Sequence, residues 1–467
     1  MRRRSILGTA ATLLFGRSFP VSAAETPPAL VGRWSGVLQA GVRRLRLSLD
    51  VATDGTGTLR SLDQGGGPIP AVVASEDGDR IRIEVAPIGG VFEGRLSDDR
   101  LEGTWRQGGA GLPLVLARGD RAPSPPPVAP LDDAGLRDLL RASGAPALAA
   151  AVARRNGATQ VWAQGERQAG SGATIGREDR WHLGSITKSL TATLVARLVD
   201  GGRVRWDDTV GEHLAEAAPD MRAEHRGATF RHLLSHRSGL PGNLPMADLL
   251  RYERRKDDPR ADRVRYVRQT LGQAPVGPAE RTFEYSNSGY VVAAAMLEAK
   301  LGESWERLIG DWVFTPLRLG SAGFGAPGRA DAVAQPVGHG PGPQGPATPY
   351  PPGAPVNDNP AVLGPAGRVH MSLPDLLLYL SAHRDRTDFL QTATWSVLHT
   401  PPFGGDYALG WFVRPGGELW HAGSNTLWYA EALVGPATGV AAAAAANSAA
   451  AASVVGSALA RAAAGSG

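Results

Sequence analysis

Apolar and polar side chains alternate along the first part of the chain. Leucine or valine occupies every second position of residues 45–51, with arginine, serine and aspartate between them, and residues 81–85 repeat this alternation. A period of two is typical of half-buried β-strands, and the Asp-Gly pairs at 54–55 and 77–78 are typical of hairpin turns. The pattern predicts a small antiparallel β domain over residues 29–118, a meander or partial barrel with a structural or accessory role. A binding role is the alternative. Its expected core anchors are Trp34, Phe92 and Trp105.

The pattern changes after residue 118. The run RGDRAPSPPPVAP, residues 118–130, has no apolar period, so residues 119–131 are expected to form a semi-rigid linker. Beyond it, apolar spacings of three and four predict helices, and short apolar runs between turn residues predict strands. Helices are expected at 136–140, 186–198, 206–214, 290–301, 374–380 and from 449 onward, and strands at 147–153, 160–163, 428–434 and from 440. This mixture predicts an α+β domain over residues 132–462.

Two segments need more than composition. Residues 441–446 are all alanine and would be helical by propensity, but Pro436 and Gly439 make a hairpin and Asn447 ends the run, so a strand is expected. Glycine and proline remove any periodicity from residues 320–367. We expect a long ordered loop or lid there, across one face of the domain.

The N-terminus has the pattern of a cleaved export signal. Three arginines at 2–4 precede an apolar run at 6–15, and small residues near Ala23 provide a cut site. Residues 1–23 are therefore expected to be removed on export, which makes the protein periplasmic or secreted. The run is too short to cross a bilayer, so no stable membrane span is expected. Arg3 and Arg4, followed by Ser-Ile-Leu, resemble a twin-arginine signal and leave that export route open.

Composition removes several classes of function. The formal net charge of +4 is carried by the signal, whose four arginines are accompanied by no acidic residue, so the mature chain is neutral. Nucleic-acid binding is therefore not its expected role. The chain has no cysteine, which excludes disulfides, thiolate zinc sites and cysteine nucleophiles.

Candidate chemistry first appears in residues 181–202, WHLGSITKSLTATLVARLVDGG. Ser185 and Lys188 stand three apart at the start of a predicted helix, so the amine can reach the hydroxyl proton. The positive end of the helix dipole favours the serine alkoxide. The alternative is a capping serine beside a surface lysine, and two later motifs weigh against it.

Those two motifs supply the remaining groups. Tyr285-Ser286-Asn287 precedes a predicted helix and offers a phenol and an amide, and His421-Ala422-Gly423-Ser424 precedes an aromatic and apolar run. His232 and His236 stand four apart and could face a metal, but no third ligand of suitable spacing follows. Residues 232–242, HLLSHRSGLPG, are therefore expected to be a structural helix-to-turn segment without zinc.

Together the three motifs resemble the serine β-lactamase and penicillin-binding-protein superfamily, and most closely its class C-like esterase and D-alanyl-peptidase branch. The resemblance covers residues 131–460, and residues 232–242 and 409–411 are similar to further stretches typical of that branch. It implies a β-lactamase-like transpeptidase fold, in which helical layers flank an antiparallel sheet whose edge strand carries the third motif. It implies neither a metal nor an organic cofactor.

Carried over residue by residue, the resemblance implies that Ser185 is the nucleophile, Lys188 its proton acceptor and Tyr285 the partner acid or base. The implied substrate-binding residues are Asn287, His421, Gly423 and Ser424. The oxyanion hole would be formed by the backbone N–H groups of Ser185 and Ser424. For Lys188 to act as a base near neutrality, its pKa must fall from about 10.4 toward ~7, which costs about 5 kcal/mol and requires a water-poor pocket.

One departure from the family pattern bears on the substrate. Where β-lactamases of this superfamily usually have lysine and threonine, this chain has His421 and Ala422, which weakens the usual clamp on a carboxylate. The departure favours a small-molecule ester, then a D-amino-acid or other cell-wall-related peptide as for a D-alanyl carboxypeptidase or D-aminopeptidase, then a β-lactam.

Rival interpretations come from other classes. A ligand-binding or regulatory protein on an inactive hydrolase fold is one, and retention of the chemistry at all three motifs argues against it. An α/β-hydrolase is another, and the absence of any G-x-S-x-G pentapeptide excludes it. The oligomeric state stays open, as does the group that activates the deacylating water, Tyr285 or His421.

Overall fold

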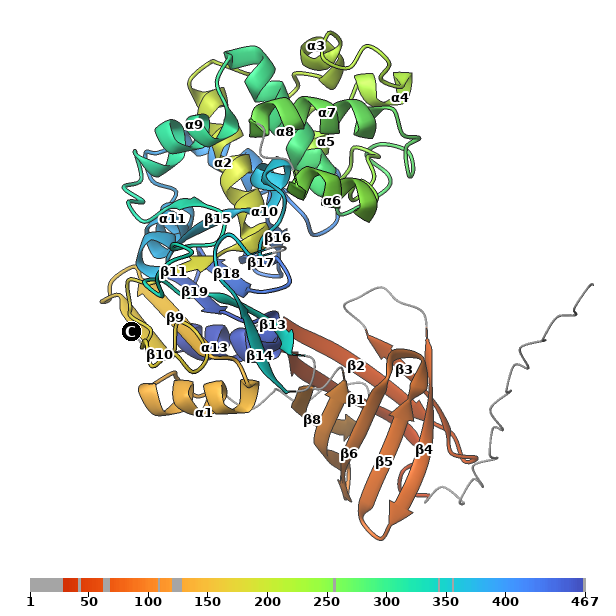
Figure 1. The fold of residues 1–467 in the computed structure, drawn as a ribbon. Coiled ribbons are helices and arrows are strands. Elements are labelled where there is room, and N and C mark those ends of the chain that lie inside the picture. The colour runs from red at the N-terminus through yellow and green to blue at the C-terminus, as the bar shows by residue number, and fades with distance from the viewer. Residues whose placement is uncertain are drawn as a thin grey trace, which may run out of the picture. The chain divides into compact units, whose positions relative to one another are not determined.

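The chain forms two compact units, residues 1–126 and 127–467, in the computed structural model (Figure 1). The structure describes residues 28–40, 43–61, 68–107, 110–119, 128–254, 258–342, 345–354 and 357–464. The expected export signal, residues 1–23, and most of the expected linker lie outside these ranges. Each unit has its own hydrophobic core.

The first unit is a closed antiparallel β-barrel. Each strand pairs with the next, and the last strand returns to pair with the first. The strands are β1 (Gly32–Ala40), β2 (Arg43–Val51), β3 (Thr56–Ser61), β4 (Ile69–Asp77), β5 (Arg80–Val85), β6 (Gly90–Ser97), β7 (Arg100–Gln107) and β8 (Ala110–Arg118). The expected antiparallel β domain is confirmed, and the barrel is complete rather than partial. Closure pairs the two strand edges that an open meander would leave exposed.

Alternation places the apolar residues of each strand inside the barrel. The three expected anchors, Trp34, Phe92 and Trp105, are at most 4% exposed, and the indole of Trp34 donates a hydrogen bond to the carbonyl of Leu30 at 2.8 Å. Arginine and glutamate side chains pair on the outside, as between Arg82 and Glu84 at 3.0 Å. The interior is thus filled by the side chains that the sequence pattern selects.

The second unit is built on a six-stranded antiparallel sheet of order β10-β9-β19-β18-β17-β16. These strands are β9 (Ala147–Arg154), β10 (Gln160–Gly165), β16 (Phe412–Val413), β17 (Leu419–Ser424), β18 (Tyr429–Gly435) and β19 (Val440–Ala446). Smaller sheets are formed by β11 (Arg180–His182), β12 (Gly323–Phe324) and β15 (Val369–Ser372), and by β13 (Gly338–Gly342) and β14 (Gly345–Tyr350).

Helices surround this sheet. They are α1 (Asp133–Ser143), α2 (Thr187–Asp200), α3 (Val210–Leu214), α4 (Ala223–Arg226), α5 (Phe230–Leu234), α6 (Met246–Arg254), α7 (Pro259–Leu271), α8 (Asn287–Leu301), α9 (Trp305–Ile309), α10 (Gly364–Gly367), α11 (Leu373–Asp385), α12 (Thr392–Leu398) and α13 (Ala452–Ala464). Within the second unit, α1 and α13 lie on one side of the sheet, and α11, α2 and the group formed by α3 to α8 lie on the other (Figure 1). None of the helices in the described ranges has the length and apolar character that a membrane span requires.

The alanine run is a central strand, as expected. Ala441–Ala446 pair with β18 on one side and with β9 on the other, and every one of these alanines is fully buried. Helices α11 and α13 both pack on β19. Small side chains on both faces of this strand allow the two helix layers to approach it closely, which outweighs the intrinsic helix propensity of alanine.

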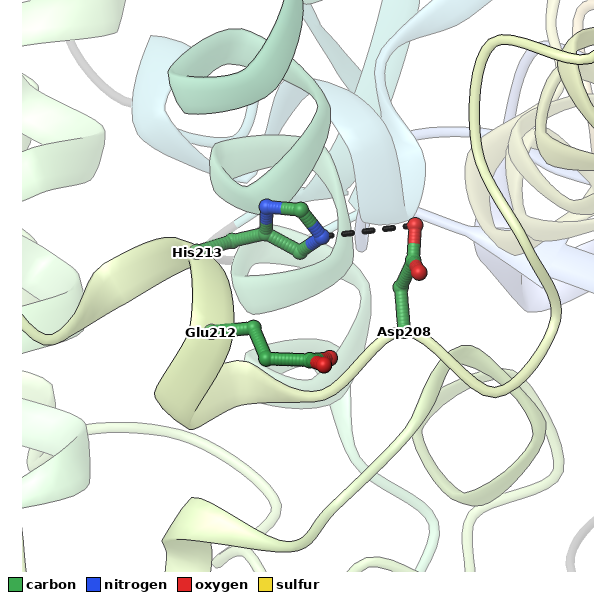
Figure 2. Close-up of side chains that lie close together, drawn as sticks. All are labelled: Asp208, Glu212 and His213. Atoms are coloured by element: carbon green, nitrogen blue, oxygen red, sulfur yellow. Dashed lines mark ion pairs between the residues drawn. The ribbon is translucent and has the colours of Figure 1, made fainter.

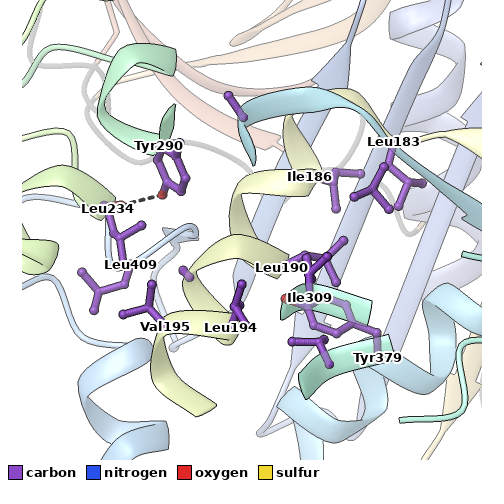
Figure 3. Close-up of a cluster of buried hydrophobic side chains, with 14 of the residues drawn as sticks. Leu183, Ile186, Leu190, Leu194, Val195, Leu234, Tyr290, Ile309, Tyr379 and Leu409 are labelled. Atoms are coloured by element: carbon purple, nitrogen blue, oxygen red, sulfur yellow. Dashed lines mark hydrogen bonds between the residues drawn. The ribbon is translucent and has the colours of Figure 1, made fainter. Parts of the chain in front are cut away.

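Helix α2 is the most enclosed element of the unit. Nearly all of its side chains are buried, including the polar ones, as is typical of a helix inside a core rather than on a surface. Figure 3 shows Leu190 and Leu194 of this helix among side chains from α9, α11 and the segment around Leu409. The start of α2 is therefore held rigidly from several sides.

Three expectations need correction. Residues 320–367 are not a simple loop or lid, because they contain β12, the β13–β14 hairpin and α10. The helix expected at 206–214 begins only at Val210, where Thr209 and Glu212 form a capping box. The third motif was expected on an edge strand, but it lies on β17, and β16 is the edge strand of the sheet. Because β16 pairs only with Leu419 and Trp420, residues 421–424 have no strand partner on that side within the described part of the chain.

Candidate active site

Ser185 lies on a tight 3-10 turn between β11 and α2. The turn spans Gly184–Ile186, and Gly184 has a φ of 50°, a left-handed conformation that glycine adopts without strain. Ser185 is partly exposed although residues on both sides of it are buried. The chain therefore presents this one hydroxyl to solvent at the N-terminal end of a buried helix.

Lys188 points from the first turn of α2 back to Ser185. Its Nζ lies 3.0 Å from Ser185 Oγ, 2.6 Å from Asn287 Oδ1 and 2.9 Å from the carbonyl oxygen of Ala366. The side chain is fully buried, and burial lowers the pKa of Lys188 to about 7. Near neutral pH a large fraction of this amine is therefore unprotonated and able to accept a proton.

Tyr285 comes from the loop that leads into α8, and Asn287 is the first residue of that helix. The helix is capped by Ser286, whose Oγ accepts a hydrogen bond from Gly289 N at 3.0 Å. Lys188 Nζ lies 4.8 Å from the centre of the Tyr285 ring. Burial raises the pKa of Tyr285 to about 12, although a hydrogen bond with the Ser185 side chain acts in the opposite direction. Tyr285 is therefore a neutral phenol at physiological pH, in contact with the serine hydroxyl.

The third motif packs directly against the serine turn. A Cβ atom on Gly423 would lie 2.5 Å from the backbone nitrogen of Ser185, and one on Gly184 would lie 2.3 Å from that of Ser424. Only glycine permits so close an approach of the two backbones. The Ser424 hydroxyl bonds within its own turn, to the carbonyl of Trp428 at 2.7 Å. The backbone of Ser424, rather than its side chain, is therefore placed beside Ser185.

His421 is buried and has both ring nitrogens occupied. Nδ1 lies 2.7 Å from the carbonyl oxygen of Ala422, and Nε2 lies 3.1 Å from the hydroxyl of Tyr407. Because a carbonyl can only accept, Nδ1 carries the proton and Nε2 accepts from the tyrosine. Burial, together with the nearby charge of Lys188, lowers the pKa of His421 to about 3. This histidine is neutral and has no nitrogen left for a water molecule.

The six other residues expected from the sequence thus lie around Ser185. Three further residues lie in the same region, and none of them belongs to the three motifs. Asn243 accepts a hydrogen bond from Asn287 Nδ2 at 2.8 Å, Tyr407 holds His421, and His236 contacts the ring of Tyr285 with centroids 4.3 Å apart. Asn243 directly follows the HLLSHRSGLPG segment, so the resemblance of that segment to the family was the available signal.

His236 holds the Tyr285 segment on both sides. Its Nδ1 accepts from the backbone of Ser286 at 2.9 Å, and its carbonyl oxygen accepts from that of Glu284 at 3.0 Å. The backbone of His236 has a φ of 60°, which is uncommon for residues other than glycine. His232 lies elsewhere, with its Nδ1 in the cap of α5 at Thr229 and its ring stacked on Phe403. The two histidines have separate partners and do not face a common metal position.

A different group has metal-like spacing. Ligand atoms of Asp208, Glu212 and His213 lie within 4.8 Å of one another (Figure 2). His213 Nε2 lies 3.3 Å from Asp208, and the guanidinium of Arg205 lies 2.9 Å from Asp208 and 3.7 Å from Glu212. The positive charge that these carboxylates need is thus supplied by Arg205. Glu212 also belongs to the capping box of α3, so the group is accounted for by the way this helix begins.

A partly exposed serine, a buried lysine of lowered pKa and a tyrosine, between a helical layer and an antiparallel sheet, define a serine hydrolase of the SxxK type. The family model described as Beta-lactamase matches residues 133–465, and the chain belongs to this family. The expected fold class is thereby confirmed.

Individual relatives match part of the chain. Penicillin-binding protein 4 of Amycolatopsis lactamdurans is 30% identical over 226 residues, 48% of this chain and 55% of that protein. PbpX of Bacillus subtilis (strain 168) is 25% identical over 237 residues, 50% of this chain and 54% of that protein. The chain thus spans about half the length of these curated relatives.

Solved structures share the fold of the second unit. The D-amino acid amidase from Ochrobactrum anthropi SV3 has a TM-score of 0.58 at 20% identity, over 70% of this chain and 95% of that chain. EstCE1, described as a hydrolase with promiscuous acyltransferase activity, has a TM-score of 0.54 at 19% identity, over 68% and 94%. At these identities the likeness concerns the fold alone.

Proposed function

We propose that this protein is an esterase that forms an acyl-enzyme on Ser185, with carboxylic esters or related uncharged acyl compounds as substrates. The observation that carries the proposal is the neutrality of the site. His421 is uncharged with both nitrogens occupied, Ala422 has no hydroxyl, and Lys188 has a pKa of about 7. A substrate carboxylate would meet no permanent cation among these groups, whereas an ester needs none.

In the acylation step, unprotonated Lys188 accepts the proton of Ser185 across the 3.0 Å contact. Ser185 Oγ then forms a bond to the ester carbonyl carbon, and the carbonyl oxygen becomes an oxyanion. The backbone N–H groups of Ser185 and Ser424 stabilise it, and each such donor typically contributes roughly 3 kcal/mol to the transition state. Collapse of this intermediate breaks the bond to the alcohol oxygen.

Tyr285 is suited to carry the proton to the leaving alcohol. As a neutral phenol, with a pKa raised to about 12, it gives its proton to the departing alkoxide while it takes one from protonated Lys188. Water then replaces the alcohol, and the same two groups remove its proton as it attacks the acyl-enzyme. His421 does not fit the role of activating this water, because neither of its nitrogens is available.

The proposal is tested by covalent labelling and turnover of the purified protein. A fluorophosphonate probe is expected to label Ser185, as located by peptide mass spectrometry, and short-chain p-nitrophenyl esters are expected to be hydrolysed. Ser185→Ala abolishes both, whereas Ser396→Ala, at an exposed serine of α12, changes neither. A label on another serine contradicts the assignment.

Substrate class is decided by a comparison of rates. An ester, a D-Ala-D-Ala peptide, a D-amino acid amide and nitrocefin are compared by kcat/KM on the same preparation. The ester is expected to be fastest. A faster peptide or amide would identify a D-alanyl carboxypeptidase or D-aminopeptidase, a faster nitrocefin a β-lactamase, and labelling without turnover a binding or regulatory role.

We further propose that the protein works outside the cytoplasm, as the pattern of residues 1–23 predicts. Fractionation of cells that express the complete chain, with N-terminal sequencing of the product, tests this. Cleavage near Ala23 is expected, and an intact N-terminus in the cytoplasm would contradict the proposal.

A further inference from the structure

A buried carboxylate, that of Asp358, contacts three of the segments that form the candidate site. Asp358 belongs to the glycine- and proline-rich stretch 320–367, and its side chain is 4% exposed. Its oxygens lie 2.9 Å from His182 Nε2, 3.1 Å from Arg368 Nε and 3.0 Å from Asn425 Nδ2. These three partners belong to three different segments, and each segment is adjacent to one part of the site.

The first connection reaches the serine turn. His182 is the last residue of β11 and is fully buried. Its Nδ1 accepts a hydrogen bond from the backbone of Gly184 at 3.1 Å, and its Nε2 lies 2.9 Å from an oxygen of Asp358. The carboxylate therefore orients the His182 ring, and His182 holds the peptide between Leu183 and Gly184 at the start of the serine turn.

The second connection reaches the lysine. Arg368 directly follows α10, whose Ala366 carbonyl oxygen accepts from Lys188 Nζ at 2.9 Å. Asn359, next to Asp358, donates from Nδ2 to the carbonyl of Gly367 at 3.0 Å. The segment that binds the lysine amine is thus held just after Ala366, at Gly367 by Asn359 and at Arg368 by Asp358.

The third connection reaches the other side of the expected oxyanion hole. Asn425 follows Ser424 at the end of β17, and besides its bond to Asp358 its Oδ1 accepts from Leu427 N at 3.2 Å. The turn after Ser424 is therefore held to the same carboxylate as the turn before Ser185. The two N–H groups that would bind the oxyanion come from these two turns.

We infer that Asp358 is a positioning residue for hydrolysis, which fixes the spacing of the two backbone N–H donors and of Lys188 through His182, Asn425 and Arg368. The inference rests on the proposed function of Ser185 and goes beyond it, because Asp358 lies outside all three motifs. In this role Asp358 links three segments of the site from within the stretch 320–367, for which the sequence predicted a loop or lid.

The electrostatics of Asp358 agree with a permanently charged support. Burial opposes its charge, but the interactions with His182 and then Arg368 outweigh burial and hold the pKa of Asp358 well below its usual value. A buried carboxylate with these partners is costly to break, since removing one member leaves the others unpaired. Loss of the charge is therefore expected to move the segments that it joins.

The experiment separates positioning from general stability. Asp358→Asn keeps the shape of the side chain and removes its charge. The matched control is Glu298→Gln, which removes the charge of another buried carboxylate, 3% exposed and paired with Arg263 at 3.0 Å, without a contact to the three motifs. For each variant the melting temperature, kcat and KM on a p-nitrophenyl ester, and the affinity for a phenylboronic acid are measured.

Both variants are expected to melt at lower temperature, but only Asp358→Asn is expected to lose kcat, by about 10- to 100-fold, with little change in KM. Its affinity for the boronic acid should fall by a similar factor, because the tetrahedral adduct on Ser185 uses the same N–H groups as the transition state. If Asp358→Asn does not fold, Asn425→Ala removes one connection, and a smaller loss of the same kind is expected.

Equal losses of kcat in Asp358→Asn and Glu298→Gln, or unchanged boronic acid affinity in Asp358→Asn, would overturn the inference. Failure of the proposed function looks different. If wild-type protein is labelled at Ser185 but hydrolyses no ester, the esterase proposal fails, and the rate of fluorophosphonate labelling still compares the two variants.

Discussion

Replacing Lys188 by methionine should abolish activity and also change how stability depends on pH. The folded state buries this amine completely, and burial lowers its pKa from 10.5 to about 7. The unfolded chain keeps an ordinary lysine, so it binds more protons than the folded state between these two pH values. The wild-type protein therefore becomes more stable as pH rises through this window, and a methionine in its place removes the effect.

The expected magnitude follows from the shift itself. One pKa unit corresponds to about 1.4 kcal/mol, so the free energy of unfolding of the wild type gains about 1.4 kcal/mol per pH unit from this group. Methionine also leaves Asn287 Oδ1 and the Ala366 carbonyl without a partner, which costs about 1–3 kcal/mol for each group. That cost does not depend on pH. The slope of the free energy of unfolding against pH therefore reports the pKa shift of Lys188 more directly than the stability at one pH does.

The assay is urea unfolding between about pH 7.5 and 9.5, followed by the helical circular dichroism signal, which reports on the second unit. Over this range the stability of the wild type relative to Lys188→Met should rise by about 3 kcal/mol. Lys300→Met, at an exposed lysine of α8, is the control for the loss of a lysine as such. Parallel curves for wild type and Lys188→Met would refute the reasoning, because they would mean that the folded protein does not depress this pKa.

Three further outcomes are expected. In pH–rate profiles, kcat/KM for an ester should rise with an apparent pKa of about 7 and stay level to about pH 10. The reason is that Lys188 acts unprotonated and Tyr285 stays neutral over this range. A fall of kcat/KM above pH 8 would contradict these roles. The double variant His421→Lys with Ala422→Thr should increase the rate of acylation by benzylpenicillin relative to an ester, and an unchanged ratio of these rates would exclude the third motif as the cause of selectivity. His236→Asn should retain more ester activity than His236→Ala, because asparagine tolerates a positive φ and its Oδ1 can accept a hydrogen bond from Ser286 N. Equal kcat values for the two variants would show that His236 does not position Tyr285.

The local sequence pattern was sufficient to predict a feature when all residues that define the feature lie within one helix or strand. Alternation over residues 45–51 and 81–85 predicts barrel strands, because the side-chain period of a strand is two and one face must be buried. Ser185 and Lys188 could be paired from sequence because a spacing of three brings side chains together on a helix. The strand at 441–446 was predicted against propensity, because the hairpin residues before it constrain the chain more than alanine does.

Other features depend on contacts that no spacing encodes. Closure of the barrel requires β8 to meet β1, which lie far apart in the chain. The neutrality of His421 comes from Tyr407 and from burial, and the role of His236 comes from its contacts with the Tyr285 segment. A single sequence gives no signal for such pairs, since their residue types are common and their separation is arbitrary.

The sequence by itself determined the class of the two units, the three motifs and the residues that could do chemistry, because these follow from side-chain period and from the reactivity of a few groups. Only the tertiary structure decided which groups are charged and which backbones touch. Burial sets the pKa of Lys188, and the close approach of Gly184 and Gly423 sets the distance between the two turns. Both are properties of how distant segments pack, and packing depends on the whole chain at once.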